Sequence, residues 1–149
     1  MGDYGPRELE RDCQLDIGNK LKQLVSQLNL DDKIDFLGAK LYVELKDYLA
    51  QADIFVNLSQ TGSLDKTVLE AMASKTLVLT SNEAFKSVLG DLADKLMFEP
   101  DNSQDLVDKV KQLAGLPSSQ QNKIIERLQT IVLENHNLTK TIEKIINLY

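Results

Sequence analysis

The sequence predicts an α/β protein built on a doubly wound parallel sheet. Short runs rich in Ile, Val, Leu and Phe alternate with segments of helical periodicity. Such apolar runs are expected of strands that are buried on both faces of a parallel sheet. After Pro100 only helical patterns follow, which predicts helices that cover the sheet. With 149 residues and 42% hydrophobic content, we expect one domain over residues 1–149 with a sizeable core.

An amphipathic pattern predicts the first helix over residues 8–30. Its apolar side chains recur at the spacing of one buried face: Ile17, Leu21, Leu24, Val25 and Leu28. The turn before this helix, at residues 2–6, is of the kind that normally connects a sheet strand to a helix. We therefore expect the chain to begin just after a truncated first strand.

The remaining strands and helices follow in alternation. Strands are expected at residues 33–37, 53–58, 76–80 and 95–98, with helices between them at 41–52, 66–74 and 83–88. Residues 101–103 offer caps for a helix that ends near residue 113. Ser118 and Gln121 resemble a capping box, which predicts a helix over residues 118–134. A last helix is expected over residues 139–149.

Charge and composition exclude several classes of function. The net charge of −6 argues against a broad surface for nucleic acid or anionic membranes, because both would need clustered basic residues. A single cysteine, Cys13, allows no internal disulfide and fits a reducing cytoplasm. No apolar stretch reaches the length of a membrane span, and the N-terminus lacks a signal peptide. We expect a cytoplasmic protein, although a peripheral membrane enzyme would have the same composition.

Glu70 lies in an otherwise apolar run, residues 68–73. A carboxylate removed from water needs a partner, so Glu70 is expected to face a bound polar group. Upstream lie a strand, a polar loop with Gly62 and a helix start at Lys66. That order places main-chain N–H groups and a helix N-terminus at one sheet edge, where phosphates bind. Glu70 would then face a polyol beside the phosphates; the alternative is a solvated stripe of its helix.

Several motifs occur in a fixed order along the chain. They are residues 2–7 (Gly-Asp-Tyr-Gly-Pro-Arg), Asp35–Gly38, Tyr48–Val56, Val68–Ala73 and Leu77–Thr80. As an ordered set they resemble the C-terminal, donor-binding domain of GT-B glycosyltransferases, in particular retaining family 4 (glycosyl transferases group 1). The resemblance implies one Rossmann-like half of the GT-B fold. It also implies a nucleotide-sugar site at the C-terminal edge of the sheet, and an N-terminal acceptor domain that this chain lacks.

The resemblance implies that Glu70 binds the ribose hydroxyls of the nucleotide. The family has a second glutamate, which contacts the donor sugar, at the position that is Gly62 in this chain. We expect Thr61, Ser63 or Asp65, or main-chain N–H groups, to replace that glutamate. The alternative is a plain polar turn in which Asp65 caps the helix.

Further donor contacts are expected on both sides of this loop. Main-chain N–H groups of Ser63, Leu64, Asp65 and Lys66 would hold the phosphates. Lys66 would add a charge, unless it is simply solvated. The base is expected near Gly38, Ala39 and Lys40, although Gly38 also suits a tight turn. Gly2 and Asp3 are expected near the nucleotide, and a pyrophosphate clamp of arginine and lysine would lie upstream of them. His136 is interpreted as a surface loop residue.

The first hypothesis for function is transfer of a sugar, with retention, from a UDP- or GDP-type nucleotide sugar to a glycan or lipid-linked acceptor. The reaction would occur in a full two-domain enzyme, and this chain alone is expected to bind but scarcely to catalyse. No firm catalytic residue, cofactor or metal is expected in this chain. Membrane association would come only through the missing half. Two alternatives are a non-catalytic, degenerate glycosyltransferase module and a sugar-nucleotide epimerase of the same fold.

Overall fold

The computed structural model describes the backbone of residues 6–60, 62–136, 142 and 146, with side chains from residue 16 onward. The chain divides into two compact units, Met1–Lys40 and Leu41–Tyr149. Each unit is described by itself below. The assignment of residues 1–149 to one nucleotide-sugar-binding domain stays a prediction, and most of the expected last helix lies outside the described residues.

The first unit consists of helix α1, Pro6–Gln27, and an irregular segment after it. The expected strand at residues 33–37 is wrong: no described residue of this segment pairs in a sheet, and Phe36 is exposed. Within the unit, Lys22 Nζ lies 5.8 Å from the centre of the Phe36 ring. Within this unit, the helix face expected to be buried is also largely exposed, at Ile17, Leu21 and Leu24 in α1 and at Leu28 just after it, because one irregular segment offers too little surface to cover it.

The second unit contains a small parallel sheet, which confirms the predicted α/β class. Strand β1, Ile54–Asn57, pairs in parallel with β2, Leu77–Thr80, and places Asn57 beside Thr80 at the carboxyl end. An isolated parallel bridge joins Thr80 to Met97. The expected strand at residues 95–98 is therefore wrong except at Met97. Its first two residues form the end of helix α5, Ala93–Leu96.

Four helices of this unit agree closely with the sequence periodicity. They are α2, Tyr42–Gln51; α3, Lys66–Ala73; α6, Ser103–Ala114; and α7, Ser118–Asn135. The expected helix at residues 83–88 is divided into a 3-10 turn η1, Glu83–Phe85, and α4, Lys86–Leu89; a second 3-10 turn, η2, covers Gly90–Leu92. None of the helices in the described parts of the chain is long and apolar enough to cross a membrane.

A side-chain cap explains where α6 begins, whereas α7 begins without one. Asn102 caps α6 through its side chain, which accepts a hydrogen bond from the Asp105 N–H at 3.0 Å. The expected capping box at the start of α7 is wrong. Pro117 holds the N-cap position, and Gln121 Nε2 instead donates to the main-chain oxygen of Leu113 at 2.9 Å. That bond fastens α7 to the end of α6.

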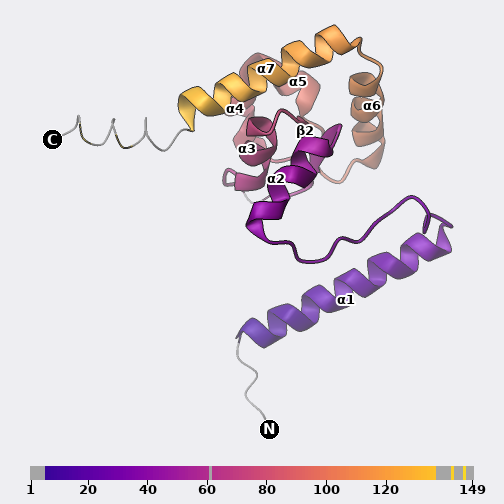
Figure 1. Cartoon of the computed structure of the whole chain (residues 1–149). Helices are drawn as coiled ribbons and strands as arrows, with labels where there is room; N and C mark the ends of the chain where they lie inside the picture. Colours follow the sequence, from indigo (N-terminus) through magenta and orange to yellow (C-terminus); the bar gives the residue numbers. More distant parts are fainter. Residues whose placement is uncertain (1–5, 61, 137–141, 143–145, 147–149) are drawn as a thin grey trace. The chain divides into compact units, whose positions relative to one another are not determined.

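The core of the second unit surrounds β2. All four residues of this strand are buried, whereas β1 is only half-buried and Val56 is exposed. Helices α3 and α7 pack against each other and against β2, and α7 forms the long orange-to-yellow helix along this unit in Figure 1. Fully buried side chains that hold these layers together include Val68, Met72, Val78, Phe85, Leu96 and Leu128. The core thereby fixes α3 against the carboxyl end of the sheet.

Candidate functional site

The carboxyl edge of the sheet is organised by a buried asparagine, Asn82, two residues beyond β2. Its Nδ2 donates to the Ser63 main-chain oxygen at 2.8 Å and to Asp65 Oδ2 at 3.0 Å. Its Oδ1 accepts from the Ala84 N–H at 3.0 Å, and its own N–H donates to Thr80 Oγ1 at 3.1 Å. Every hydrogen-bonding group of this side chain is therefore used. Asn82 ties the loop before α3 to the end of the sheet.

A second buried side chain extends this network to the neighbouring strand. Thr80 Oγ1 donates to Asn57 Oδ1 at 2.9 Å, so the last residues of the two strands are joined by side chains as well as by the main chain. Thr80 and Asn82 are both fully buried. A satisfied polar network in such surroundings is rigid, because each lost bond would leave a buried group unpaired. The loop that enters α3 is positioned by this network.

The first turn of α3 keeps open hydrogen-bond donors. Asp65 holds the N-cap position, as in the alternative interpretation of this loop, but its carboxylate makes no hydrogen bond to the turn because it accepts from Asn82 instead. The first N–H to be satisfied is that of Val68, which donates to the Asp65 main-chain oxygen at 3.2 Å. Among the described residues, the N–H groups of Lys66 and Thr67 have no acceptor. The helix N-terminus therefore presents donors and partial positive charge to a ligand.

Glu70 lies one turn further along α3 and is half-buried, not buried as its apolar neighbours suggested. Its carboxylate forms no hydrogen bond or ion pair with any described residue. The side chain lines a cavity of about 460 Å³ between α2 and α3, together with Tyr42, Val43, Lys46 and Leu49. It also lines a cavity of about 220 Å³ between α3 and α7. The carboxylate is thus available to a ligand on either side of the helix.

A third cavity, of about 180 Å³, lies directly at the carboxyl edge of the sheet. It is formed by Gln60, Gly62, Ser81, Asn82, Glu83 and Pro100. Gly62 has a φ of +70° and open space around its α-carbon. The loop therefore uses glycine for a left-handed turn that other residues rarely adopt. This turn opens the cavity beside the residues that the sequence predicted to hold the donor.

The structure brings some of the predicted site residues together and leaves others apart. Ser63, Leu64, Asp65, Lys66 and Glu70 form one loop and helix start beside Gly62. Gly38, Ala39 and Lys40 belong to the other unit, where Gly38 has a φ of +66° as a tight turn requires. Gly2, Asp3 and Thr61 lie outside the described residues. Their expected roles stay predictions.

Sequence reasoning missed the residues that hold the loop in place. Asn57 and Thr80 were assigned to expected strands without a further role, Asn82 was given no role, and His136 was interpreted as a surface loop residue. His136 is half-buried and lines the cavity between α3 and α7 with Glu70. The sequence does contain a pattern that indicates a role for Asn57, Thr80 and Asn82. Polar residues that directly follow buried parallel strands gather at the carboxyl edge, where ligands bind.

Comparison with known proteins identifies related chains. The family model described as glycosyl transferases group 1 matches residues 16–130. A curated relative, mannosylfructose-phosphate synthase of Agrobacterium fabrum, is 34% identical over 89 residues, which are 59% of this chain and 20% of the relative. The aligned part thus spans about a fifth of that relative's length.

A solved structure agrees with the family match. It is the crystal structure of the C-terminal domain of a glycosyl transferase group 1 family protein from Francisella tularensis. The likeness has a TM-score of 0.67 and 27% identity, and covers 93% of this chain and 68% of that one.

Proposed function

We propose that this chain, which belongs to the glycosyl transferases group 1 family and has a GT-B-type fold, is the donor-binding part of a retaining enzyme of family 4. It would hold a nucleotide-diphosphate sugar at the carboxyl edge of β1 and β2. A second domain would contact the acceptor, and the reaction would take place in the cleft between the two.

The observation that supports this proposal most is the state of Glu70. Its half-buried carboxylate has no described protein partner and lies one helical turn from the open N–H groups of Lys66 and Thr67. An ionised carboxylate can accept two hydrogen bonds from the vicinal hydroxyls of a ribose. A helix N-terminus with open donors suits a diphosphate. A nucleoside diphosphate carries both groups at neighbouring positions.

The chemistry assigns a defined task to this chain. The bond between the anomeric carbon and the diphosphate oxygen breaks, and the diphosphate leaves with the electron pair. A new bond joins the anomeric carbon to an acceptor oxygen, whose proton passes to the departing diphosphate. Negative charge therefore develops on the diphosphate, and the α3 donors stabilise it there without moving. Glu70 anchors the ribose so that the sugar lies in a fixed position.

Calorimetric titration with UDP, GDP, UDP-glucose and GDP-mannose tests the proposal. GDP-mannose is included because the curated relative is named mannosylfructose-phosphate synthase. Glu70→Gln removes the charge and keeps the size, so it should weaken nucleotide binding about 10- to 100-fold, the effect of losing a charge-assisted bond. Glu126→Gln, the same change at an exposed position of α7, should leave the affinity unchanged. A millimolar dissociation constant corresponds to a binding free energy of about −4 kcal/mol. If no nucleotide binds the folded protein at this concentration, the proposal is lost.

One observation favours a second candidate, a non-catalytic module. Gly62 has no side chain for the donor sugar, and open space surrounds it. A module that has lost sugar recognition would bind the free nucleotide and the nucleotide sugar equally well. The donor-binding part of an active enzyme is expected to distinguish the two. The ratio of the affinities for GDP and GDP-mannose, or for UDP and UDP-glucose, therefore separates the candidates.

A further inference from the structure

The cavity between α3 and α7 combines two basic side chains with the carboxylate of Glu70. Lys66 and His136 both line it, and the apolar side chains of Leu69, Ala73 and Val132 complete the wall. Its volume is about 220 Å³. The sequence separates these basic residues widely, so only the fold brings them into one cavity.

The alignment of the two helices places His136 at the beginning of α3. Gln129 Nε2 donates to the Ala73 main-chain oxygen at 3.1 Å, which fixes α7 against the end of α3. Equal numbers of residues separate Gln129 from His136 and Ala73 from Lys66. Because both helices rise by about 1.5 Å per residue, antiparallel packing brings His136 level with Lys66. The shared cavity agrees with this alignment.

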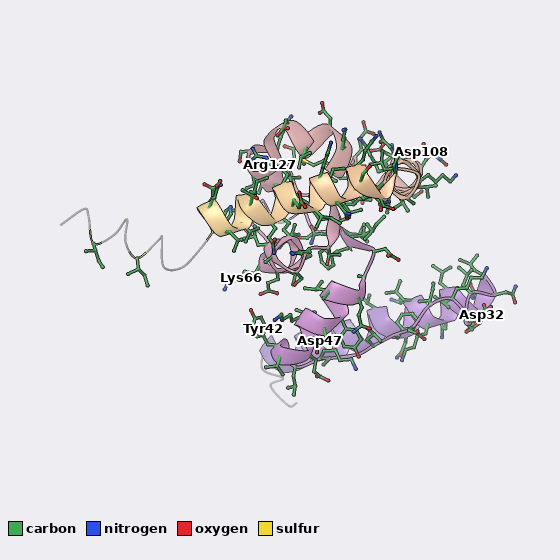
Figure 2. All side chains as sticks on the ribbon, turned by 45° about the horizontal axis from the view of Figure 1, so that its top comes forward. Asp32, Tyr42, Asp47, Lys66, Asp108 and Arg127 are labelled. Atoms are coloured by element: carbon green, nitrogen blue, oxygen red, sulfur yellow. The ribbon has the colours of Figure 1, made fainter. Side chains whose placement is uncertain are left out.

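Neither basic side chain is used within the described structure. Lys66 forms no ion pair with a described carboxylate, although Glu70 lies one turn away on the same helix. Figure 2 shows Lys66 reaching outward from the start of α3. His136 contributes its main-chain N–H to the end of α7, where it donates to the Val132 oxygen at 2.9 Å. Its imidazole makes no hydrogen bond to a described residue.

We infer that Lys66 and His136 together form a contact for the diphosphate of the nucleotide-sugar donor. The inference rests on the proposed function and extends the donor site from the α3 N-terminus onto the end of α7. The ammonium of Lys66 supplies a full charge, and the imidazole of His136 supplies an N–H donor in either protonation state. Glu70, on the same wall, takes the ribose, so neighbouring parts of one ligand meet neighbouring residues.

The single histidine of the chain provides a direct test. One imidazole gives one isolated set of NMR signals, and these can be followed in the untagged protein. We expect them to shift on titration with UDP or GDP and with inorganic pyrophosphate, and to stay in place with uridine or guanosine. A hexose phosphate represents a phosphorylated sugar acceptor. It should also leave the imidazole signals in place.

Substitutions separate this contact from a merely structural role. Lys66→Gln and His136→Gln should each weaken nucleoside diphosphate binding about 3- to 10-fold, as loss of one hydrogen bond predicts, while uridine or guanosine binding stays unchanged. Lys123→Gln, the same change at an exposed position of α7, is the matched control. Circular dichroism and urea unfolding show whether each variant is folded.

Three results would overturn the inference while the proposed function stands. One is nucleotide binding, seen by calorimetry, that leaves the imidazole signals in place. The second is a shift as large with the nucleoside alone, which would place the base there. The third is a shift with the hexose phosphate and none with the nucleotide. Failure of every nucleotide to bind would instead overturn the proposed function itself.

Discussion

Asn82 Nδ2 lies 3.0 Å from Asp65 Oδ2 and holds this carboxylate away from the helix that it precedes. An aspartate at an N-cap would ordinarily accept hydrogen bonds from the first turn. Here α3 has no side-chain cap. One buried asparagine therefore decides that the N–H groups of Lys66 and Thr67 remain open to a ligand.

Asn82→Ala is expected to destabilise the fold and weaken nucleotide binding. The change removes three side-chain hydrogen bonds at a fully buried position, so the free energy of unfolding should fall by about 2–3 kcal/mol. The released Asp65 carboxylate would then cap α3 and compete with the diphosphate. Urea unfolding and calorimetry measure the two effects.

The matched control for this variant is Asn102→Ala, at the cap of α6. It should cost about 1 kcal/mol of stability, as loss of an N-cap does, and leave nucleotide affinity unchanged. Unaltered nucleotide binding by folded Asn82→Ala protein would contradict the role assigned to Asn82.

Asp65→Asn is expected to strengthen diphosphate binding. An asparagine can still accept the hydrogen bond from Asn82, so the loop keeps its position, while a negative charge beside the site is removed. Since Asp65 is partly exposed, solvent screens the repulsion and the gain should be about threefold. Calorimetry with UDP or GDP measures it. A loss of affinity confined to the nucleotide sugar would show that Asp65 instead binds the sugar.

The local elements of this fold were predictable because their signals are local. Helices α2, α3, α6 and α7 follow the periodicity of their own residues, and β1 and β2 follow two short apolar runs. The segment at residues 33–37 also contains apolar residues, Ile34, Phe36 and Leu37, but a strand forms only where another supplies hydrogen bonds, and no described residue pairs with it. In the segment at residues 95–98, the first two residues complete the hydrogen-bonded helix α5, and only Met97 forms a bridge to the sheet.

The candidate site was predictable in its position and less so in its construction. The strand, glycine loop and helix order predicts a ligand at the carboxyl edge, and Glu70 was selected by its apolar neighbours; both stay predictions. The bonds of Asn82 to Ser63 and Asp65 connect residues that are 19 and 17 positions apart. The hydrophobic periodicity of a sequence does not predict contacts between residues so far apart. The same is true of His136, which reaches the cavity only because α7 packs along α3.

Gly62→Ala should reduce both stability and nucleotide affinity. The left-handed φ of +70° costs a residue with a β-carbon about 1 kcal/mol. The space around Gly62 is open, so the cost comes from the backbone alone, and any relaxation of the loop moves the residues that enter α3. Urea unfolding gives the first quantity and calorimetry with the nucleotide gives the second.

Gly90→Ala is the control for this backbone effect. Gly90 also has a positive φ, of +55°, and open space around it, but it ends α4, outside the predicted donor loop. Because its ψ of −120° lies outside the left-handed helical region, the alanine variant should lose at least about 1 kcal/mol of stability and keep the nucleotide affinity of the wild type. Equal losses of affinity in both variants would mean that the loop at Gly62 has no particular part in binding.

A comparison of two buried threonines, Thr76 and Thr80, separates an effect on protein stability from an effect on nucleotide binding. Thr80 ends β2 at the candidate site, and Thr76 directly precedes β2 at the opposite end, where its Oγ1 donates to the Leu49 oxygen at 2.5 Å. Threonine→valine keeps the shape and removes the hydroxyl. Each variant leaves buried groups unpaired and should lose about 1–3 kcal/mol of stability. Only Thr80→Val frees Asn82 and Asn57, so only this variant should also bind the nucleotide about 3- to 10-fold more weakly. Equal affinities for the two variants, measured by calorimetry well below their unfolding temperatures, would show that the polar network at the sheet edge supports the fold alone.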